Sequence, residues 1–133
     1  MDPFSALNRM ITSLSRKLTS RRVQFAQRLN NLAVLHQARG HYRKAEALYL
    51  QALSLQNSLA ADDLDLAQTL SNLANLYAVQ RRYSEAEPFH MQALDLYERL
   101  LGPDHYCTEA ARQELSSSAI RRMQGYFLNQ EVS

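Results

Sequence analysis

Apolar residues recur at steps of three and four along most of this chain, which is the spacing of one face of an α-helix. Leu29, Leu32 and Ala33 show the pattern in the first half, and Leu70 and Leu73 show it in the second. The pattern predicts one helix ending just before residue 40 and others over residues 42–56, 66–79 and 84–101. With only three Gly and three Pro in 133 residues, we expect helix along most of the chain.

The chain repeats itself. Residues 29–59 align with residues 70–100 at a spacing of 41 residues, and 13 of the 31 aligned positions are identical. Self-similarity at such a period is typical of stacked repeats, in which each unit buries its apolar face against its neighbours. Six alanines at equivalent positions would let the helices approach closely. They are Ala33, Ala45 and Ala52 in the first unit, and Ala74, Ala86 and Ala93 in the second.

Four short motifs carry a family resemblance. They are Leu-Asn-Asn-Leu-Ala at residues 29–33, Tyr-x-x-Ala-Glu at 42–46, Gln-Ala-Leu at 51–53 and Leu-Gly-Pro-Asp-His at 101–105. In these motifs and in its repeat period the chain resembles the tetratricopeptide repeat, in the long form of kinesin light chains. Armadillo and HEAT arrays have a compatible period but lack these motifs.

The resemblance implies an all-α fold, a right-handed superhelical stack of antiparallel helix pairs with capping helices at both ends. The first helices of the pairs would line a concave groove that commonly holds a segment of another protein. Carried over position by position, the resemblance predicts nine groove residues. They are Gln27, Asn30, Asn31, Val34, Gln37, Gln68, Ser71, Asn72 and Asn75.

The amides among these residues suit a peptide ligand, because Asn and Gln offer donors and acceptors without charge. For Asn31 and Asn72, hydrogen bonds that hold neighbouring helices together are an equally good interpretation. For Asn30 and Asn75 we expect exposure in the groove. Asn30 and Ser71 stand where a chaperone-type groove would need Lys, so we do not expect a clamp for a terminal carboxylate.

Residues 22–105 are predicted to hold the two repeats, which are fewer than the three usually needed for stability. Residues 106–124 keep the length of a third repeat without its motifs and are predicted to form a C-terminal capping helix. In that helix Arg112, Gln113, Glu114 and Arg121 are expected to face water. We expect a flexible tail over residues 125–133.

Residues 1–21 predict a separate amphipathic basic helix. Its apolar stripe is formed by Phe4, Leu7, Met10, Ile11, Leu14 and Leu18. Three interpretations stay open: a cap on the first repeat, an organelle presequence, and a helix that docks on an anionic membrane or on the acidic face of a larger complex. The docking interpretation uses five basic residues. They are Arg9, Arg16, Lys17, Arg21 and Arg22.

Charge is divided unevenly along the chain. Residues 1–44 contain nine basic residues and a single acid, Asp2, whereas the rest contains 12 acids and six Arg. The asymmetry favours an acidic partner or head-to-tail self-contact. Nucleic-acid binding is less well supported, because no aromatic ladder for stacking bases accompanies the basic residues.

The sequence offers little to catalysis or metal binding. The single Cys107 excludes an internal disulfide, and no two of the four His have the spacing of a helical zinc pair. Calcium at Asp62, Asp63 and Asp65 is a poor alternative to helix capping, because no Gly or closing Glu completes a loop. No phosphate loop or nucleophile elbow is present. We therefore predict a non-catalytic cytoplasmic module without cofactor that binds a protein or peptide.

Overall fold

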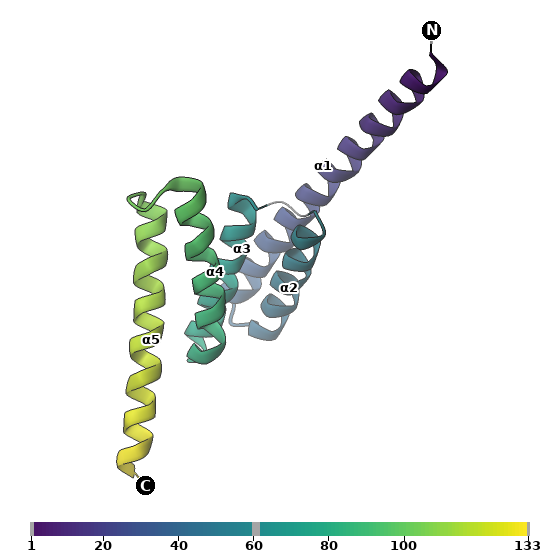
Figure 1. Ribbon diagram of the computed structural model, residues 1–133. Helices are drawn as coiled ribbons and strands as arrows, with labels where there is room; N and C mark the ends of the chain where they lie inside the picture. The colour runs from purple at the N-terminus through teal and green to yellow at the C-terminus, as the bar shows by residue number, and fades with distance from the viewer. Residues whose placement is uncertain (1, 60–61, 133) are drawn as a thin grey trace.

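The computed structural model describes residues 2–59 and 62–132, and these form five α-helices (Figure 1). They are α1 (Pro3–Ala38), α2 (Tyr42–Ser58), α3 (Leu64–Val79), α4 (Tyr83–Leu101) and α5 (Tyr106–Val132). Helices α1 and α2 form one antiparallel pair, α3 and α4 form the next, and α5 packs on α4. The predicted all-α stack of helix pairs is confirmed.

Local chemistry explains where several helices begin and end. The Asp2 carboxylate accepts a hydrogen bond from the Phe4 backbone N–H (3.0 Å) at the start of α1. Asp63 does the same for Leu66 (2.9 Å) at the start of α3. Side chains that accept from these otherwise unpaired donors stabilise helix starts. Gly40 follows α1 with a φ of 78°, a conformation that glycine adopts at little cost, so the helix ends there.

The core is centred on α3, which has nine buried residues on faces toward both neighbours. Small side chains fill the contacts between helices, and they include the six alanines that recur in the two repeats. Their exposed fractions are 0% for Ala33, Ala45, Ala52, Ala74 and Ala86, and 1% for Ala93. Leu73, Leu76 and Tyr49 fill the space beside them. Because alanine adds almost no bulk, the helix axes come close enough for these larger side chains to interlock.

The glutamate of the Tyr-x-x-Ala-Glu motif ties each repeat to the element that follows. In the first repeat, Glu46 accepts a hydrogen bond from the Tyr77 hydroxyl (2.9 Å) and lies 3.4 Å from Arg82. In the second, Glu87 accepts from Arg122 of α5 (2.7 Å). Burial, with the hydrogen bond to Glu46, raises the pKa of Tyr77 to about 12. The motif therefore links repeat to repeat at equivalent positions.

The N-terminal segment differs from the prediction. Residues 1–21 were expected to form a separate helix, but α1 runs without a break from Pro3 to Ala38, and its side chains over residues 3–22 are exposed. Figure 1 shows this part extending beyond the stack. A cap would have to fold back, and no Gly or Pro lies between Pro3 and Gly40 to end the helix. Within the described residues no helix is long and apolar enough to cross a membrane.

The C-terminal helix packs as expected but is longer. Thr108, Ala111 and Ser118 of α5 are buried against the second repeat, so the helix covers the open side of the stack. The flexible tail predicted from Gly125 is wrong over most of its length, because α5 continues to Val132. A single Gly inside a helix costs only about 1 kcal/mol relative to Ala. Ser133 lies outside the described residues.

We expect Leu73→Ala to lower the free energy of unfolding by about 2–5 kcal/mol, because it leaves a cavity in the core. Leu73 has an exposed fraction of 0%, whereas Leu32, the equivalent residue of the first repeat, is 44% exposed. Leu32→Ala is thus the matched control and should cost less than about 1 kcal/mol. Urea unfolding of both variants measures the difference, and equal losses would contradict the core assignment.

Candidate functional site

Polar side chains meet between α1 and α3 around a hollow of about 220 Å³. Asn30 donates to the Thr69 hydroxyl (2.5 Å) and accepts from the Asn72 amide (3.3 Å). Gln27 donates to Asp65 (3.2 Å). These contacts join the first helices of the two repeats directly. The structure therefore brings the predicted groove amides of both repeats together.

The same contacts change the role of some predicted residues. Asn30 was expected to be free in the groove, but it is half-buried and pairs with α3. Asn72 also accepts a hydrogen bond from Gln68 (2.9 Å), so its side chain stabilises the contact between the helices. Asn31 is exposed, and its side chain forms no hydrogen bond within the described residues. Asn31 is thus the exposed amide of this hollow that is available to a ligand, while the buried Gln56 of α2 lines the hollow with an unpaired Oε1.

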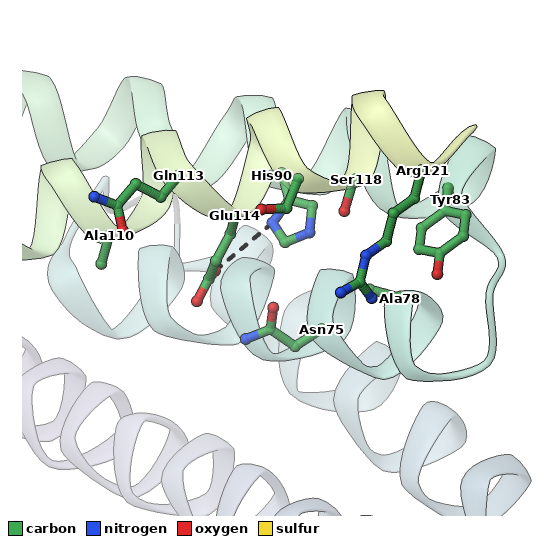
Figure 2. Close-up of a pocket in the computed structure, with 10 residues that line it drawn as sticks. Asn75, Ala78, Tyr83, His90, Ala110, Gln113, Glu114, Ser118 and Arg121 are labelled. Atoms are coloured by element: carbon green, nitrogen blue, oxygen red, sulfur yellow. Dashed lines mark ion pairs between the residues drawn. The ribbon is translucent and has the colours of Figure 1, made fainter. Parts of the chain in front are cut away.

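A second and larger hollow, of about 340 Å³, lies between α3, α4 and α5 (Figure 2). Asn75 of α3 and Glu114 of α5 lie next to each other in its lining, and His90 of α4 lies behind them. Arg121 and Tyr83 stand at its far end. Since Asn72 and Asn75 are three residues apart on α3, the two hollows adjoin along one helix face.

Glu114 is the distinctive group of this second hollow. Ser71 donates to its carboxylate (3.5 Å). Asn75, which was expected to be exposed in the groove, is half-buried and hydrogen-bonds to Glu114 as well. Burial raises the pKa of Glu114 above its ordinary value, and the bonds from Asn75 and Ser71 offset this in part. The carboxylate therefore accepts hydrogen bonds from uncharged groups only. Its negative charge is not neutralised, so it can still bind a cationic partner.

His90 is nearly fully buried, at 2% exposure, with Nδ1 3.8 Å from the Glu114 carboxylate. Burial lowers the pKa of His90, and the Glu87 carboxylate offsets this in part. The ring is thus neutral at pH 7, and the contact marked in Figure 2 is not an ion pair at that pH. Its Nε2 has no hydrogen-bond partner among the described residues.

The remaining predicted residues are placed as follows. Val34 is exposed, at 47%. Gln37 is half-buried and accepts a hydrogen bond from the Tyr49 hydroxyl (2.9 Å), so it braces α2 against α1. Ser71 is buried and turned toward α5. Among the residues described, no group of three His, Cys, Asp or Glu side chains is arranged to hold a metal ion.

The five basic docking candidates, Arg9, Arg16, Lys17, Arg21 and Arg22, are all exposed along the free part of α1. The described residues offer them no acidic partner. Arg9 donates only to the Ser5 carbonyl one turn earlier (3.4 Å). Figure 1 shows the first half of α1 extending away from α3, α4 and α5, whose residues line the two hollows, so these basic residues form a separate surface.

Glu114 was expected to face water, and the structure instead turns it toward α3. A signal for this was present in the repeat register. At a spacing of 41 residues, Leu32, Leu73 and Glu114 occupy equivalent positions. A carboxylate at a position held by leucine in two preceding repeats indicates that the third helix differs from a simple cap.

The sequence profile of the tetratricopeptide repeat family matches residues 25–63 and 66–106, which cover most of both helix pairs. The chain belongs to the tetratricopeptide repeat family. The crystal structure of BtubC (BKLC) from P. vanneervenii is similar in fold, with a TM-score of 0.73 and 22% sequence identity. The match covers 86% of this chain and 49% of that protein, so the chain spans about half its length. No curated protein gives a significant match.

The burial of His90 predicts an acid-sensitive component of stability. Because its folded pKa is lowered, the unfolded chain takes up a proton at a higher pH than the folded chain does. Stability is then lost as pH falls below the ordinary value of 6.5, by at most about 1.4 kcal/mol per pH unit. His90→Phe, which cannot titrate, should lose less stability than wild type between pH 7.5 and about pH 5.5 in urea unfolding. Equal losses in the two proteins would refute the assignment.

Proposed function

We propose that this protein is a non-catalytic interaction module of the cytoplasm that holds a segment of a partner protein along α1, α3 and α5. Tetratricopeptide repeats suggest a protein–protein interaction module, and the family is generally non-catalytic. The partner segment would lie across the two adjoining hollows, beside Asn31, Asn72 and Asn75. The observation that carries the proposal is the row of amides between the first helices of successive repeats, closed at one end by Glu114.

The residues of this row differ in how much of their polar capacity the fold uses. Asn30 and Asn72 bond to each other, so they hold the surface in shape. Asn31 keeps its donors and its acceptor free, and such groups pair readily with the backbone of an extended peptide. A rigid, partly satisfied lining of this kind loses little entropy when a ligand binds.

Glu114 indicates which kind of side chain the proposed ligand should carry. A half-buried carboxylate that is met by uncharged donors gains a strong hydrogen bond from an ammonium or guanidinium group. We therefore expect the bound segment to place a Lys or Arg beside Glu114. The asparagine side chains would hydrogen-bond to the backbone of the bound segment, and the Glu114 carboxylate would select its basic side chain.

A library of random 12-residue peptides displayed on phage provides a defined ligand source. Peptides selected on the full-length chain should lose at least about tenfold in affinity, or about 1.4 kcal/mol, for an Asn31→Ala, Asn75→Ala double variant. The matched control is Gln51→Ala, Gln92→Ala, which removes two exposed amides at equivalent positions of α2 and α4. Unchanged affinity for the first variant, in a protein with unchanged unfolding, would exclude the groove.

Glu114→Gln separates binding from stability. Glutamine keeps the hydrogen bonds with Ser71 and Asn75 but removes a charge whose burial is unfavourable, so the melting temperature should not fall. Selected peptides that contain Lys or Arg should bind at least about tenfold more weakly, as measured by fluorescence anisotropy. If these peptides bind the variant as well as wild type, the carboxylate does not select them.

A further inference from the structure

The free part of α1 carries a stripe of large apolar side chains that nothing in the described chain covers. Met10 lies at the edge of the stripe. The exposed fractions of the central residues are 70% for Phe4, 51% for Leu7, 53% for Ile11, 57% for Leu14 and 55% for Leu18. Contiguous exposed apolar surface of this extent marks an interaction site.

The spacing within the stripe is that of a coiled-coil seam. Phe4, Leu7, Ile11, Leu14 and Leu18 alternate at steps of three and four, so they occupy successive a and d positions of a heptad. A projecting helix of this length is marginal in water without packing. Ion pairs along its surface do not support it, because Asp2 is the sole acid before Lys44. The segment therefore needs another helix or surface against the stripe.

The direction of the stripe is fixed by the rest of α1. Leu18 and Phe25 are seven residues apart, and Phe25 and Leu29 are four apart, so all three lie on one side of a continuous helix. Phe25 and Leu29 line a shared hollow with Leu55 and Ser58 of α2. The stripe is thus the continuation, past the end of α2, of the seam on which α2 packs.

The direction of the stripe favours a helix over a lipid surface as the structure that covers it. A flat lipid surface laid on the stripe would meet α2, which lies on the same side of α1. A helix placed in line with α2 meets no such obstacle. We propose that the occupant is the same segment of a second copy of this chain, packed antiparallel as a two-stranded coiled coil. Such a contact is isologous and closes as a dimer.

In the proposed register, Leu7 of one copy packs on Leu18 of the other, and Ile11 packs on Leu14, following the alternation of a and d layers. Residues 4–21 of the two copies then cover each other, and each copy's helix start lies near the end of the other's α2. At each end of the contact Phe4 of one copy faces Arg21 of the other, and its ring packs on the apolar stem of that arginine.

Charge favours the antiparallel arrangement. Arg21 continues the seam at a d position, so in a parallel pair it would lie against Arg21 of the other copy, and like charges opposite one another are destabilising. In the antiparallel register, Lys17 faces the uncharged Asn8 region, and Arg21 and Arg22 lie near Asp2 of the other copy. Arg9 and Arg16 point away from the seam in either case, since they lie at outer heptad positions.

A second exposed apolar group offers a poorer fit. Met123, Tyr126 and Phe127 near the end of α5 are 49–60% exposed. They span only residues 123–127, whereas the stripe runs from Phe4 to Leu18, so they would leave most of the stripe uncovered. With roughly 100 Å² of apolar surface covered per stripe residue, the α1–α1 contact buries about 1,000 Å² or more in total, which is at the threshold for a specific interface.

Sedimentation equilibrium of the full-length chain tests the pairing. Wild type should sediment at twice 15.2 kDa at concentrations of about 10 µM, in the range of moderate dimer affinities. An Ile11→Gln, Leu14→Gln variant should raise the dimer dissociation constant at least about 100-fold. Both residues are exposed, so the fold of the repeats is unaffected. The matched control, Arg9→Gln, Arg16→Gln, changes the outer side of the same helix and should leave a dimer.

Disulfide trapping tests the orientation. In a Cys107→Ser background, a Leu7→Cys protein mixed with a tagged Leu18→Cys protein should form the mixed disulfide in preference to either self-linked product. A preference for self-linked products would overturn the antiparallel register.

Two further results would overturn the proposal as a whole. One is a monomeric wild type at about 100 µM, well above the expected dissociation constant. The other is a monomer that co-sediments with vesicles containing phosphatidylserine and loses that binding in the Ile11→Gln, Leu14→Gln variant, which would make lipid the occupant. Because the stripe is remote from Asn31 and Glu114, neither result bears on peptide binding.

Discussion

Contacts between helices at buried alanines hold the two repeats at a short and constant spacing. Ala33 and Ala45 of the first pair belong to one packed cluster, Ala74 and Ala86 belong to the second pair, and all four are fully buried. A larger side chain at any of these positions would push the axes apart. The hydrogen bonds of Asn30 with Thr69 and Asn72 exist only at this spacing, so the candidate groove depends on the alanine contacts.

Stability and function place different demands on the surface between α3 and α5. Leucine at the position of Glu114 would repeat what Leu73 does in the core. The carboxylate there is desolvated and met by uncharged groups, which does little for the fold. Such a residue is more readily understood as a contribution to binding, in line with the tendency of perturbed carboxylates to lie at functional sites.

Helix α1 belongs to two surfaces at once. Its second half packs on α2 and α3, and its first half continues the same seam into solvent. A rigid helix without Gly or Pro transmits the orientation of the repeats to the projecting end. Pairing of two such ends would place two grooves in one particle, and a partner with two matching segments would then gain avidity without any new contact.

The sequence by itself determined the repeat, its family and most helix boundaries, because these depend on residues close together in the chain. Gly40 ended a helix and Asp63 began one, as local chemistry requires. The unbroken course of α1 was also available from the lack of Gly or Pro before residue 40. Only the tertiary structure decided that Asn30 pairs with α3, that Glu114 faces Ser71, and that the α1 stripe lies on the side of α2. Helical spacing fixes which residues share a face, but the packing of distant residues fixes which neighbour that face meets.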